Sequence, residues 1–324
     1  MSGAATEDPP TVAPTQAKPR EWDGKTRTGL GILIFFYTFR LLGPRFAYAL
    51  LYPVVLYYQF FARANGRGSY DYLRRRFPGI GRFKLWFMRY RHFMGFGRCL
   101  IDRGYAFLGM MGKVRLNRDG QEAMQAALDK GCGVILLSAH LGNWELAAYC
   151  LGDFHHNGRK VPVNAVMFKG DGERVERQLR KAGGEPPFKV IASNDSLQAS
   201  IECKNALERG EIVAIHGDRL LGERGIEVDF LGAPAKFPTG PFVLAASTGA
   251  PVVFTFANRV GYKHYALLAR GPYYFEYTSR REREANLKQW VGMYASQLEV
   301  LLQKYPLQWH NFYMFWGTKR GTGW

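Results

Sequence analysis

The sequence predicts an α/β fold, a single layered domain in which a mixed, mostly parallel sheet is flanked by helices. Two observations support this prediction. From about Val114 onward, short apolar runs rich in Val, Ile and Leu alternate with stretches of helical periodicity, which is typical of layered α/β domains. Residues 29–61, the most apolar part of the chain, precede this pattern. The fold is therefore expected to carry an N-terminal apolar helical segment that associates with a membrane.

The N-terminal part divides into a tail and this apolar segment. Residues 1–28 are rich in Pro, Ala and Thr without periodicity, and we expect a disordered tail rather than a signal peptide. Within the membrane-associating segment, 29–62, the longest clean run is 46–61. As a helix it would be roughly 24 Å long, shorter than the roughly 30 Å hydrocarbon core of a bilayer. An interfacial helix is therefore favoured, and a tilted single span that includes Arg40 stays open.

Charge and aromatic content both point to a lipid surface. The net charge is +17, and residues 63–103 hold many arginines opposed only by Asp71 and Asp102. Because this run follows the apolar segment, we interpret residues 63–112 as a basic helical arm on an anionic, cytoplasmic membrane surface. A solvated helix face is the alternative. Aromatic residues gather at both ends of the chain, which favours a lipid–water boundary over a Tyr-rich core. No nucleic-acid partner is expected, because helix-turn-helix, zinc-finger and RNP signatures are absent from the sequence.

Residues 113–324 form the predicted α/β core. Asp119 is placed to cap a helix that Gly131 ends, and Asn143 is placed to cap the helix 144–151. The expected strands are 134–138, 163–168, 189–192, 212–216 and 251–257. The other expected helices are 172–181, 197–208, 241–248 and 286–304.

One strand–loop–helix unit carries the strongest chemical signal. His140 lies just beyond the strand 134–138, where open α/β sheets place their ligands, and Glu145 lies in the first turn of the next helix. A carboxylate beside an imidazole fixes its tautomer and stabilises the imidazolium. We therefore expect His140 to be a general base that Glu145 orients, with Asn143 between them as a substrate-binding residue. The alternative is a structural histidine and a glutamate that complements the helix dipole.

Two later blocks supply further candidate substrate-binding residues. Asp218 and Arg219 follow the strand 212–216, and Arg219 is suited to pair with a phosphate or pantetheine group. A structural ion pair between the two is the alternative. Phe237 and Gly240 stand at the start of an apolar helix that could wall an acyl chain. A simple turn with an N-terminal proline explains them nearly as well.

Several other catalytic classes lack their motifs. The sequence has no GxSxG nucleophile elbow and no complete GxGxxG, P-loop or HExxH pattern. This argues against an α/β-hydrolase and against dinucleotide, P-loop nucleotide and zinc-protease sites. The four cysteines are scattered without a CxxC pair, so a disulfide framework is not expected. No metal is expected either, because four possible ligands match no standard spacing: His155, His156, His216 and Asp218.

The motif His140-Leu-Gly-Asn-Trp-Glu145, together with later blocks, resembles the late lipid A acyltransferases. These are the lauroyl and myristoyl transferases of the lysophospholipid acyltransferase superfamily, whose hallmark is a histidine, four residues and an acidic residue. The later blocks are Gly217-Asp218-Arg219, Phe237-Pro-Thr-Gly240, Thr248-Gly-Ala-Pro-Val252 and Pro306-Leu-Gln-Trp309. The resemblance covers residues 30–316, and its specificity comes from the ordered set. The tail 309–316 departs from the more basic continuation of those enzymes, which indicates a divergent branch.

The resemblance implies a membrane-associated acyltransferase on the cytoplasmic face of the bacterial inner membrane, peripheral or with a single span. It implies an acyl carrier protein or coenzyme A thioester as donor, a membrane lipid as acceptor, and no cofactor beyond that cosubstrate. His140 and Glu145 carry over as the catalytic pair, and Asp218 and Arg219 carry over as residues that position substrate. The divergent tail leaves aminolipids, glycolipids and an aryl-polyene lipid open as acceptors.

Two functions from other classes also stay open. One is a non-catalytic membrane-surface protein that binds lipid through its basic arm, and its lipid binding would be indifferent to His140. The other is a hydrolase of lipid thioesters, which would release acyl chains to water without any acceptor.

Overall fold

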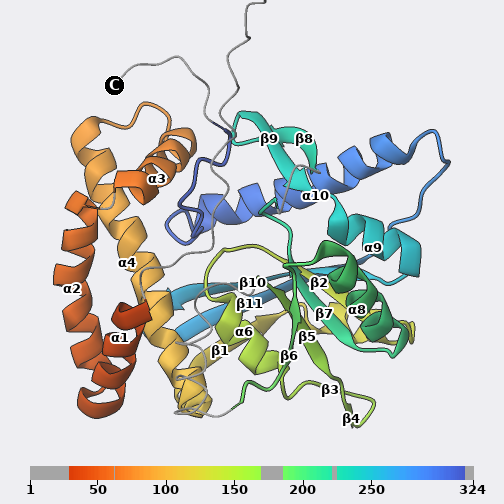
Figure 1. Ribbon diagram of the computed structural model, residues 1–324, viewed down its shortest axis with the longest axis horizontal. Coiled ribbons are helices and arrows are strands. Elements are labelled where there is room, and N and C mark those ends of the chain that lie inside the picture. The colour runs from red at the N-terminus through yellow and green to blue at the C-terminus, as the bar shows by residue number, and fades with distance from the viewer. Residues whose placement is uncertain (1–28, 62, 169–184, 221–224, 318–324) are drawn as a thin grey trace, which may run out of the picture.

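Figure 1 shows the fold as a computed structural model, which describes residues 29–61, 63–168, 185–220 and 225–317. The expected tail 1–28 and the expected helix 172–181 lie outside the described residues. Four helices come first among the described residues and stand together along one side of the sheet (Figure 1). They are α1 (Gly29–Leu42), α2 (Pro44–Phe61), α3 (Arg63–Arg76) and α4 (Arg82–Phe107).

Two glycines of α4 allow α1 and α2 to pack closely against it. A Cβ on Gly97 would lie 2.3 Å from Leu51 Cδ1, and one on Gly104 would lie 3.1 Å from the ring of Phe39. Leu51 of α2 and Phe39 of α1 are accordingly buried. The cluster that they join also contains side chains of the sheet. A larger residue at Gly97 would force the buried side chain of Leu51 to move, because packed interiors have little room for added methyl groups.

The outer surface of these helices exposes large apolar side chains. Leu41 is 75% exposed, Phe61 is 68% exposed, and Phe83 at the start of α4 is 83% exposed. Single exposed apolar groups are ordinary on a soluble surface, but so many on adjoining helices are not. Within the described ranges, no helix has both the length and the hydropathy needed to cross a membrane. Membrane association by this segment stays a prediction.

The core is a seven-stranded sheet that is mixed and mostly parallel, as the sequence predicts. Its strand order is β1-β11-β10-β2-β7-β5-β6, and only the pair β10–β11 is antiparallel among neighbouring strands of this sheet. The strands are β1 (Arg115–Asp119), β2 (Val134–Ser138), β5 (Val163–Met167), β6 (Lys189–Ala192), β7 (Ile212–His216), β10 (Val252–Gly261) and β11 (His264–Tyr273). The expected strands therefore form, with some ends shifted.

Helices cover both faces of this sheet (Figure 1). They are α5 (Gln121–Leu128), α6 (Trp144–Leu151), α8 (Ser196–Glu208), α9 (Gly240–Thr248) and α10 (Arg283–Lys304). Ile135 and Leu137 of β2 pack in one cluster with α8, α9 and α10, whereas Val134 and Leu136 pack in another with α5. The alternation follows from the two-residue period of a strand. Because both faces of β2 are covered, its sequence is apolar throughout.

The C-terminal segment, residues 305–317, folds back into the core. Trp309 is fully buried, and its ring lies 5.0 Å from the rings of Tyr72 and Phe315. The expectation that the C-terminal aromatics meet a lipid boundary is therefore wrong for Trp309, which is a core residue. Two hairpins complete the fold, β3 (His155–His156) with β4 (Arg159–Lys160), and β8 (Gly225–Phe230) with β9 (Ala233–Pro238).

The helix cap expected at Asp119 is also wrong. Asp119 ends β1, and its carboxylate accepts two hydrogen bonds from Arg270 of β11, at 3.1 Å and 2.7 Å. Gly120 takes the cap position of α5 with φ 84°, and a Cβ there would lie 2.0 Å from Ala269 O. Only glycine fits so close to the neighbouring backbone at a positive φ.

Candidate active site

The loop between β2 and α6 is held by backbone hydrogen bonds on two sides. Gly142 N donates to Gln308 O (2.8 Å), and Asn143 N donates to Ala257 O (2.8 Å). His140 O accepts from His310 N (2.7 Å). Gly142 has φ 73°, and a Cβ there would lie 2.0 Å from Ala257 O, so this position requires glycine. Strand β10 and the C-terminal segment thus clamp the loop that carries His140.

His140 is oriented by the carboxylate of Asp218. His140 Nδ1 lies 2.8 Å from Asp218 Oδ1, and His140 N donates to Asp218 Oδ2 (2.9 Å). Trp309 Nε1 also donates to Asp218 Oδ2 (2.8 Å). Since an ionised carboxylate only accepts, Nδ1 carries the proton and Nε2 keeps its lone pair. No hydrogen bond among the described residues uses His140 Nε2, so this nitrogen is available to a substrate.

The surroundings keep His140 neutral and Asp218 ionised. Burial lowers the pKa of His140, and Arg219 lowers it further, while Asp218 opposes both effects. Burial alone would raise the pKa of Asp218, but His140 and Arg219 hold it below its usual range. A neutral imidazole with a free nitrogen is the form that accepts a proton. The pair therefore has the protonation states that a general base and its orienting carboxylate require.

The structure corrects the orienting role expected of Glu145. Asn143 caps α6 directly after the loop, because its side-chain oxygen accepts a hydrogen bond from Leu146 N (3.2 Å). Glu145 lies in the first turn of that helix and forms an ion pair with Arg103 of α4. Asp218, from the loop after β7, occupies the position at His140 Nδ1 that was expected for Glu145. A catalytic contribution of Glu145 stays a prediction.

The register of β2 and β7 explains why His140 and Asp218 meet. Ser138 pairs with His216 in the parallel ladder, so the residues two positions further along both strands also lie side by side. Tyr294 and Gly217 tie the strand ends together by donating to Ser138 O at 2.8 Å each. In the sequence, both strands are followed by polar residues. This pattern predicts the contact only when the strand order, with β2 next to β7, is known.

Arg219 and Asn143 lie close to His140, whereas Phe237 and Gly240 do not line its surroundings. Arg219 donates to His310 O (2.8 Å), next to the backbone contact of His310 with His140. Phe237 is buried on β9 in the cluster of α9 and α10, and Gly240 begins α9. Neither Phe237 nor Gly240 lines the cavity described next, and an acyl-chain wall formed by these two residues stays a prediction.

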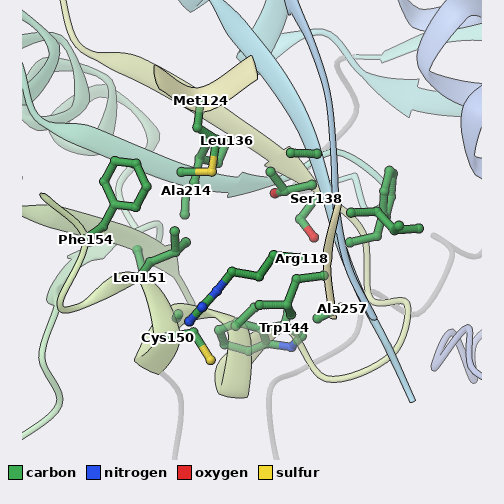
Figure 2. Close-up of a pocket in the computed structure, with 18 of the residues that line it drawn as sticks. Arg118, Met124, Leu136, Ser138, Trp144, Cys150, Leu151, Phe154, Ala214 and Ala257 are labelled. Atoms are coloured by element: carbon green, nitrogen blue, oxygen red, sulfur yellow. The ribbon is translucent and has the colours of Figure 1, made fainter. Parts of the chain in front are cut away.

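An apolar cavity of about 390 Å³ lies on the other face of the sheet, under α5 and α6 (Figure 2). Its apolar walls include Met124, Leu136, Leu151, Phe154 and Ala214. Six consecutive strands contribute to the lining, from β5 to β1. Figure 2 shows Arg118, on the edge strand β1, reaching across the cavity toward Cys150.

The cavity passes close to His140. Ser138, Trp144 and His216 all line it. The ring of His216 lies 4.2 Å from that of His140 and 4.7 Å from that of Trp144. Burial lowers the pKa of His216 well below its usual value, and His140 lowers it further, so His216 presents a neutral wall. Sequence reasoning singled out neither His216 nor Trp309 for these roles, since each acts through a contact distant in the chain.

The residues weighed as metal ligands are not brought together. His155 and His156 lie on the β3–β4 hairpin, where His156 Nε2 contacts Asp129 Oδ1 at 3.2 Å. His216 and Asp218 lie at the carboxyl end of β7 beside His140. Among the described residues, no group of three or more His, Cys, Asp or Glu side chains could hold a metal ion.

Comparison with known proteins gives the family. Residues 103–318, more than half of the chain, match the bacterial lipid A biosynthesis acyltransferases. Phosphatidylinositol mannoside acyltransferase of Mycobacterium tuberculosis is 31% identical over 144 residues, 42% of this chain and 42% of that protein. Its counterpart in Mycolicibacterium smegmatis is 30% identical over 133 residues, 39% of this chain and 40% of that protein. The chain thus spans about two fifths of the length of these curated relatives. By the extent of the family match, this chain belongs to the bacterial lipid A biosynthesis acyltransferase family.

Proposed function

We propose that the chain transfers a fatty acyl group from an acyl thioester to a hydroxyl or amino group of a lipid, with His140 as general base. The observation that carries this proposal is the position of His140 between a buried carboxylate and an apolar cavity. The donor is a thioester of an acyl carrier protein or of coenzyme A. The names of the relatives favour a glycolipid acceptor over the other lipids that the sequence leaves open.

The proposed reaction needs no nucleophile from the enzyme. The acceptor hydroxyl gives its proton to His140 Nε2 as its oxygen forms a bond to the thioester carbonyl carbon. The tetrahedral intermediate then collapses, the carbon–sulfur bond breaks, and the imidazolium returns the proton to the thiolate. Asp218 stabilises the imidazolium in between. General base catalysis of this kind contributes about 10²- to 10⁴-fold.

The cavity on the α5–α6 face is the proposed site of the acyl chain. Its volume, about 390 Å³, falls in the range of roughly 300–1,000 Å³ that is usual for small-molecule pockets. Its apolar lining suits a methylene chain, and three of its lining residues, Ser138, Trp144 and His216, bring it close to His140. A thioester carbonyl held next to His216 would lie beside the proposed base.

The exposed apolar surface of α1 and α2 supports a proposed location at the bacterial inner membrane, on its cytoplasmic face. Side chains such as Leu41, Phe46 and Phe61 are more than half exposed, and an interfacial helix buries such groups among lipid chains. The basic arm that follows would contact anionic headgroups. Peripheral binding of this kind would bring the site to a lipid acceptor.

The decisive experiment follows labelled acyl transfer by the purified chain. Acyl carrier protein and coenzyme A thioesters are offered separately, with and without bacterial lipid extract. His140→Ala should lower transfer by at least about 10²-fold, whereas His264→Ala on β11 should leave it nearly unchanged. Equal rates in His140→Ala and wild type would contradict the mechanism. Acyl release to water at the same rate without lipid would favour a thioesterase.

A further inference from the structure

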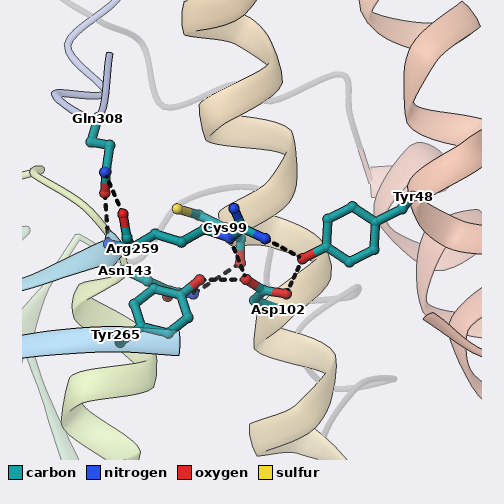
Figure 3. A network of polar contacts seen from close by, with 7 residues as sticks. All are labelled: Tyr48, Cys99, Asp102, Asn143, Arg259, Tyr265 and Gln308. Atoms are coloured by element: carbon teal, nitrogen blue, oxygen red, sulfur yellow. Dashed lines mark hydrogen bonds and ion pairs between the residues drawn. The ribbon is translucent and has the colours of Figure 1, made fainter. Parts of the chain in front are cut away.

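A buried ion pair joins α4 to β10 behind the catalytic loop (Figure 3). Arg259 Nε lies 3.1 Å from Asp102 Oδ2, and the side chain of Asp102 is 1% exposed. Tyr48 of α2 also donates to Asp102, and Arg259 Nη2 donates to the Tyr48 hydroxyl at 3.3 Å. Tyr265 of β11 donates to Asp102 Oδ2 at 2.5 Å. Four elements therefore meet at one carboxylate, which lines no part of the cavity.

The charge of Asp102 determines the direction of the hydrogen bonds that lead away from it. An ionised carboxylate only accepts, so the hydroxyl proton of Tyr265 points to Asp102 and the Tyr265 oxygen must accept from elsewhere. It accepts from Asn143 Nδ2 (3.3 Å), which also donates to Cys99 O (3.1 Å). With its NH₂ group so engaged, Asn143 turns its carbonyl oxygen toward Leu146 N (3.2 Å). That last contact is the cap that starts α6.

Arg259, the ion-pair partner of Asp102, is connected to the same loop through a second set of hydrogen bonds. Arg259 N donates to Gln308 Oε1, and Gln308 Nε2 donates to Arg259 O, both at 2.8 Å (Figure 3). Gln308 O then accepts from Gly142 N (2.8 Å). The Asp102–Arg259 pair is thus connected to Gly142 and Asn143, the two residues that follow Leu141 and His140 in the loop.

We propose that Asp102 is a positioning residue, which acts through Tyr265 and Asn143 to hold the His140 loop in its reactive geometry. The inference rests on the proposed role of His140 as general base. Removing the relay frees Asn143 to rotate its amide, which loosens the first turn of α6 and the loop before it. A misplacement of about 1 Å at a catalytic group can cost about 10²-fold in rate, so the effect falls on kcat rather than on donor binding.

The cleanest test is Tyr265→Phe, which removes one hydroxyl and leaves the Asp102–Arg259 ion pair in place. Tyr72→Phe is the matched control, because Tyr72 is equally buried and donates to a backbone oxygen, Pro306 O, at 2.7 Å. A second comparison sets Asp102→Asn against Glu211→Gln. Glu211 is a buried carboxylate that pairs with Arg209 at the opposite, amino-terminal end of β7.

Two measurements are made on each full-length variant. The first separates kcat from KM for the acyl donor, and the second follows hydrogen–deuterium exchange of residues 141–151. Tyr265→Phe and Asp102→Asn should lower kcat by about 10- to 100-fold with little change in KM. The same variants should exchange faster at 141–151, and the two controls should change neither quantity by more than about twofold.

The outcomes separate this inference from the proposed function. Wild-type exchange at 141–151 in Tyr265→Phe overturns the positioning role, whether or not acyl transfer is observed, because exchange reports on the loop directly. Unchanged transfer in His140→Ala would instead count against the proposed function alone. If Asp102→Asn does not fold, Tyr265→Phe decides the matter by itself. Faster exchange in the controls as well would show a general loss of stability and would also overturn the proposal.

Discussion

His140 takes its orientation from a residue 78 positions later in the chain. Asp218 accepts from His140 Nδ1, from His140 N and from the indole of Trp309, so both of its oxygens are engaged. Carboxylates held by several donors keep their charge and their position. The imidazole is therefore fixed by its Nδ1 side, and Nε2 makes no hydrogen bond to another described residue.

This geometry predicts that substitutions of the two acidic residues near His140 lower kcat by different amounts. Asp218→Asn presents an NH₂ group to Nδ1 and favours the wrong tautomer, so kcat should fall about 10²- to 10⁴-fold. Glu145→Gln, which weakens the contact with Arg103, should lower kcat less. Steady-state kinetics with a fixed acyl thioester measure both. A larger loss in Glu145→Gln would restore Glu145 as the principal carboxylate partner of His140.

The pH dependence of the reaction should report on the pKa of His140. Burial and Arg219 lower this pKa from its ordinary value of 6.5, so activity should persist below pH 6.5 and fall only when His140 is protonated. Arg219→Gln removes one cause of the lowering, and the acid limb of kcat/KM should move to higher pH. A shift of the limb to lower pH would contradict this account.

At the scale of single residues, the sequence predicted what depends on local pattern. Asn143 caps α6 as expected, because a cap requires only the residues that follow it. The partner of His140 was misassigned, because Glu145 is near in sequence while Asp218 is near only once β7 pairs with β2. The sequence does not predict the contact of Trp309 with Asp218 for the same reason, since the two residues are 91 positions apart.

At the scale of elements, α6 controls the shape of the cavity. Ala147 and Ala148 face the sheet there, and small side chains at these positions leave the space open. Ala147→Phe should fill part of that space and shift the preferred donor toward shorter acyl chains. Competition between thioesters of different length, analysed by mass spectrometry, measures the shift. Ala246→Phe on α9, also partly buried but on the other face, is the matched control.

An unchanged chain-length profile in Ala147→Phe would place the acyl chain elsewhere. Overpacking a core position costs about 1–3 kcal/mol, so the thermal unfolding of both variants is compared first. Equal stability with different chain preference is the result that supports the cavity as the acyl site.

The elements that the sequence did not predict are mostly polar or peripheral. β1 reads Arg-Leu-Asn-Arg-Asp and is an edge strand in which only Leu116 is partly buried, so no apolar run marks it. The strands with buried faces on both sides, β2 and β7, show the apolar runs that predicted them. The sequence does not predict strand β11 either, because its side chains alternate between buried and exposed only in part of its length.

At the scale of the whole molecule, buried neutral histidines should weaken the fold in acid. Burial lowers the pKa of His92 to about 4, and lowers the pKa of His216 and His310 well below 6.5. Between about pH 6.5 and 4 the unfolded chain binds protons that the folded chain does not, so stability falls as the pH falls. Urea unfolding at pH 7 and pH 4.5 should show the difference.

One variant measures how much His92 contributes to this loss of stability in acid. His92 contacts Ser69 Oγ (2.8 Å) and Trp309 O (2.7 Å), and His92→Gln keeps polar groups there without a titrating proton. The loss of unfolding free energy between pH 7 and pH 4.5 should shrink by about 1–3 kcal/mol in this variant. An identical loss in wild type and His92→Gln would show that His92 does not titrate in this window.

The position of the C-terminal segment also determines the order in which the residues around His140 are synthesised. His140 and Asp218 leave the ribosome well before Gln308, Trp309 and His310, which supply the hydrogen bonds that clamp the loop and the carboxylate. A nascent chain therefore holds both members of the dyad without the indole that fixes them. On the proposed mechanism, a chain that stops before Gln308 should hold His140 and Asp218 without the contacts that fix them, and it should transfer acyl groups slowly.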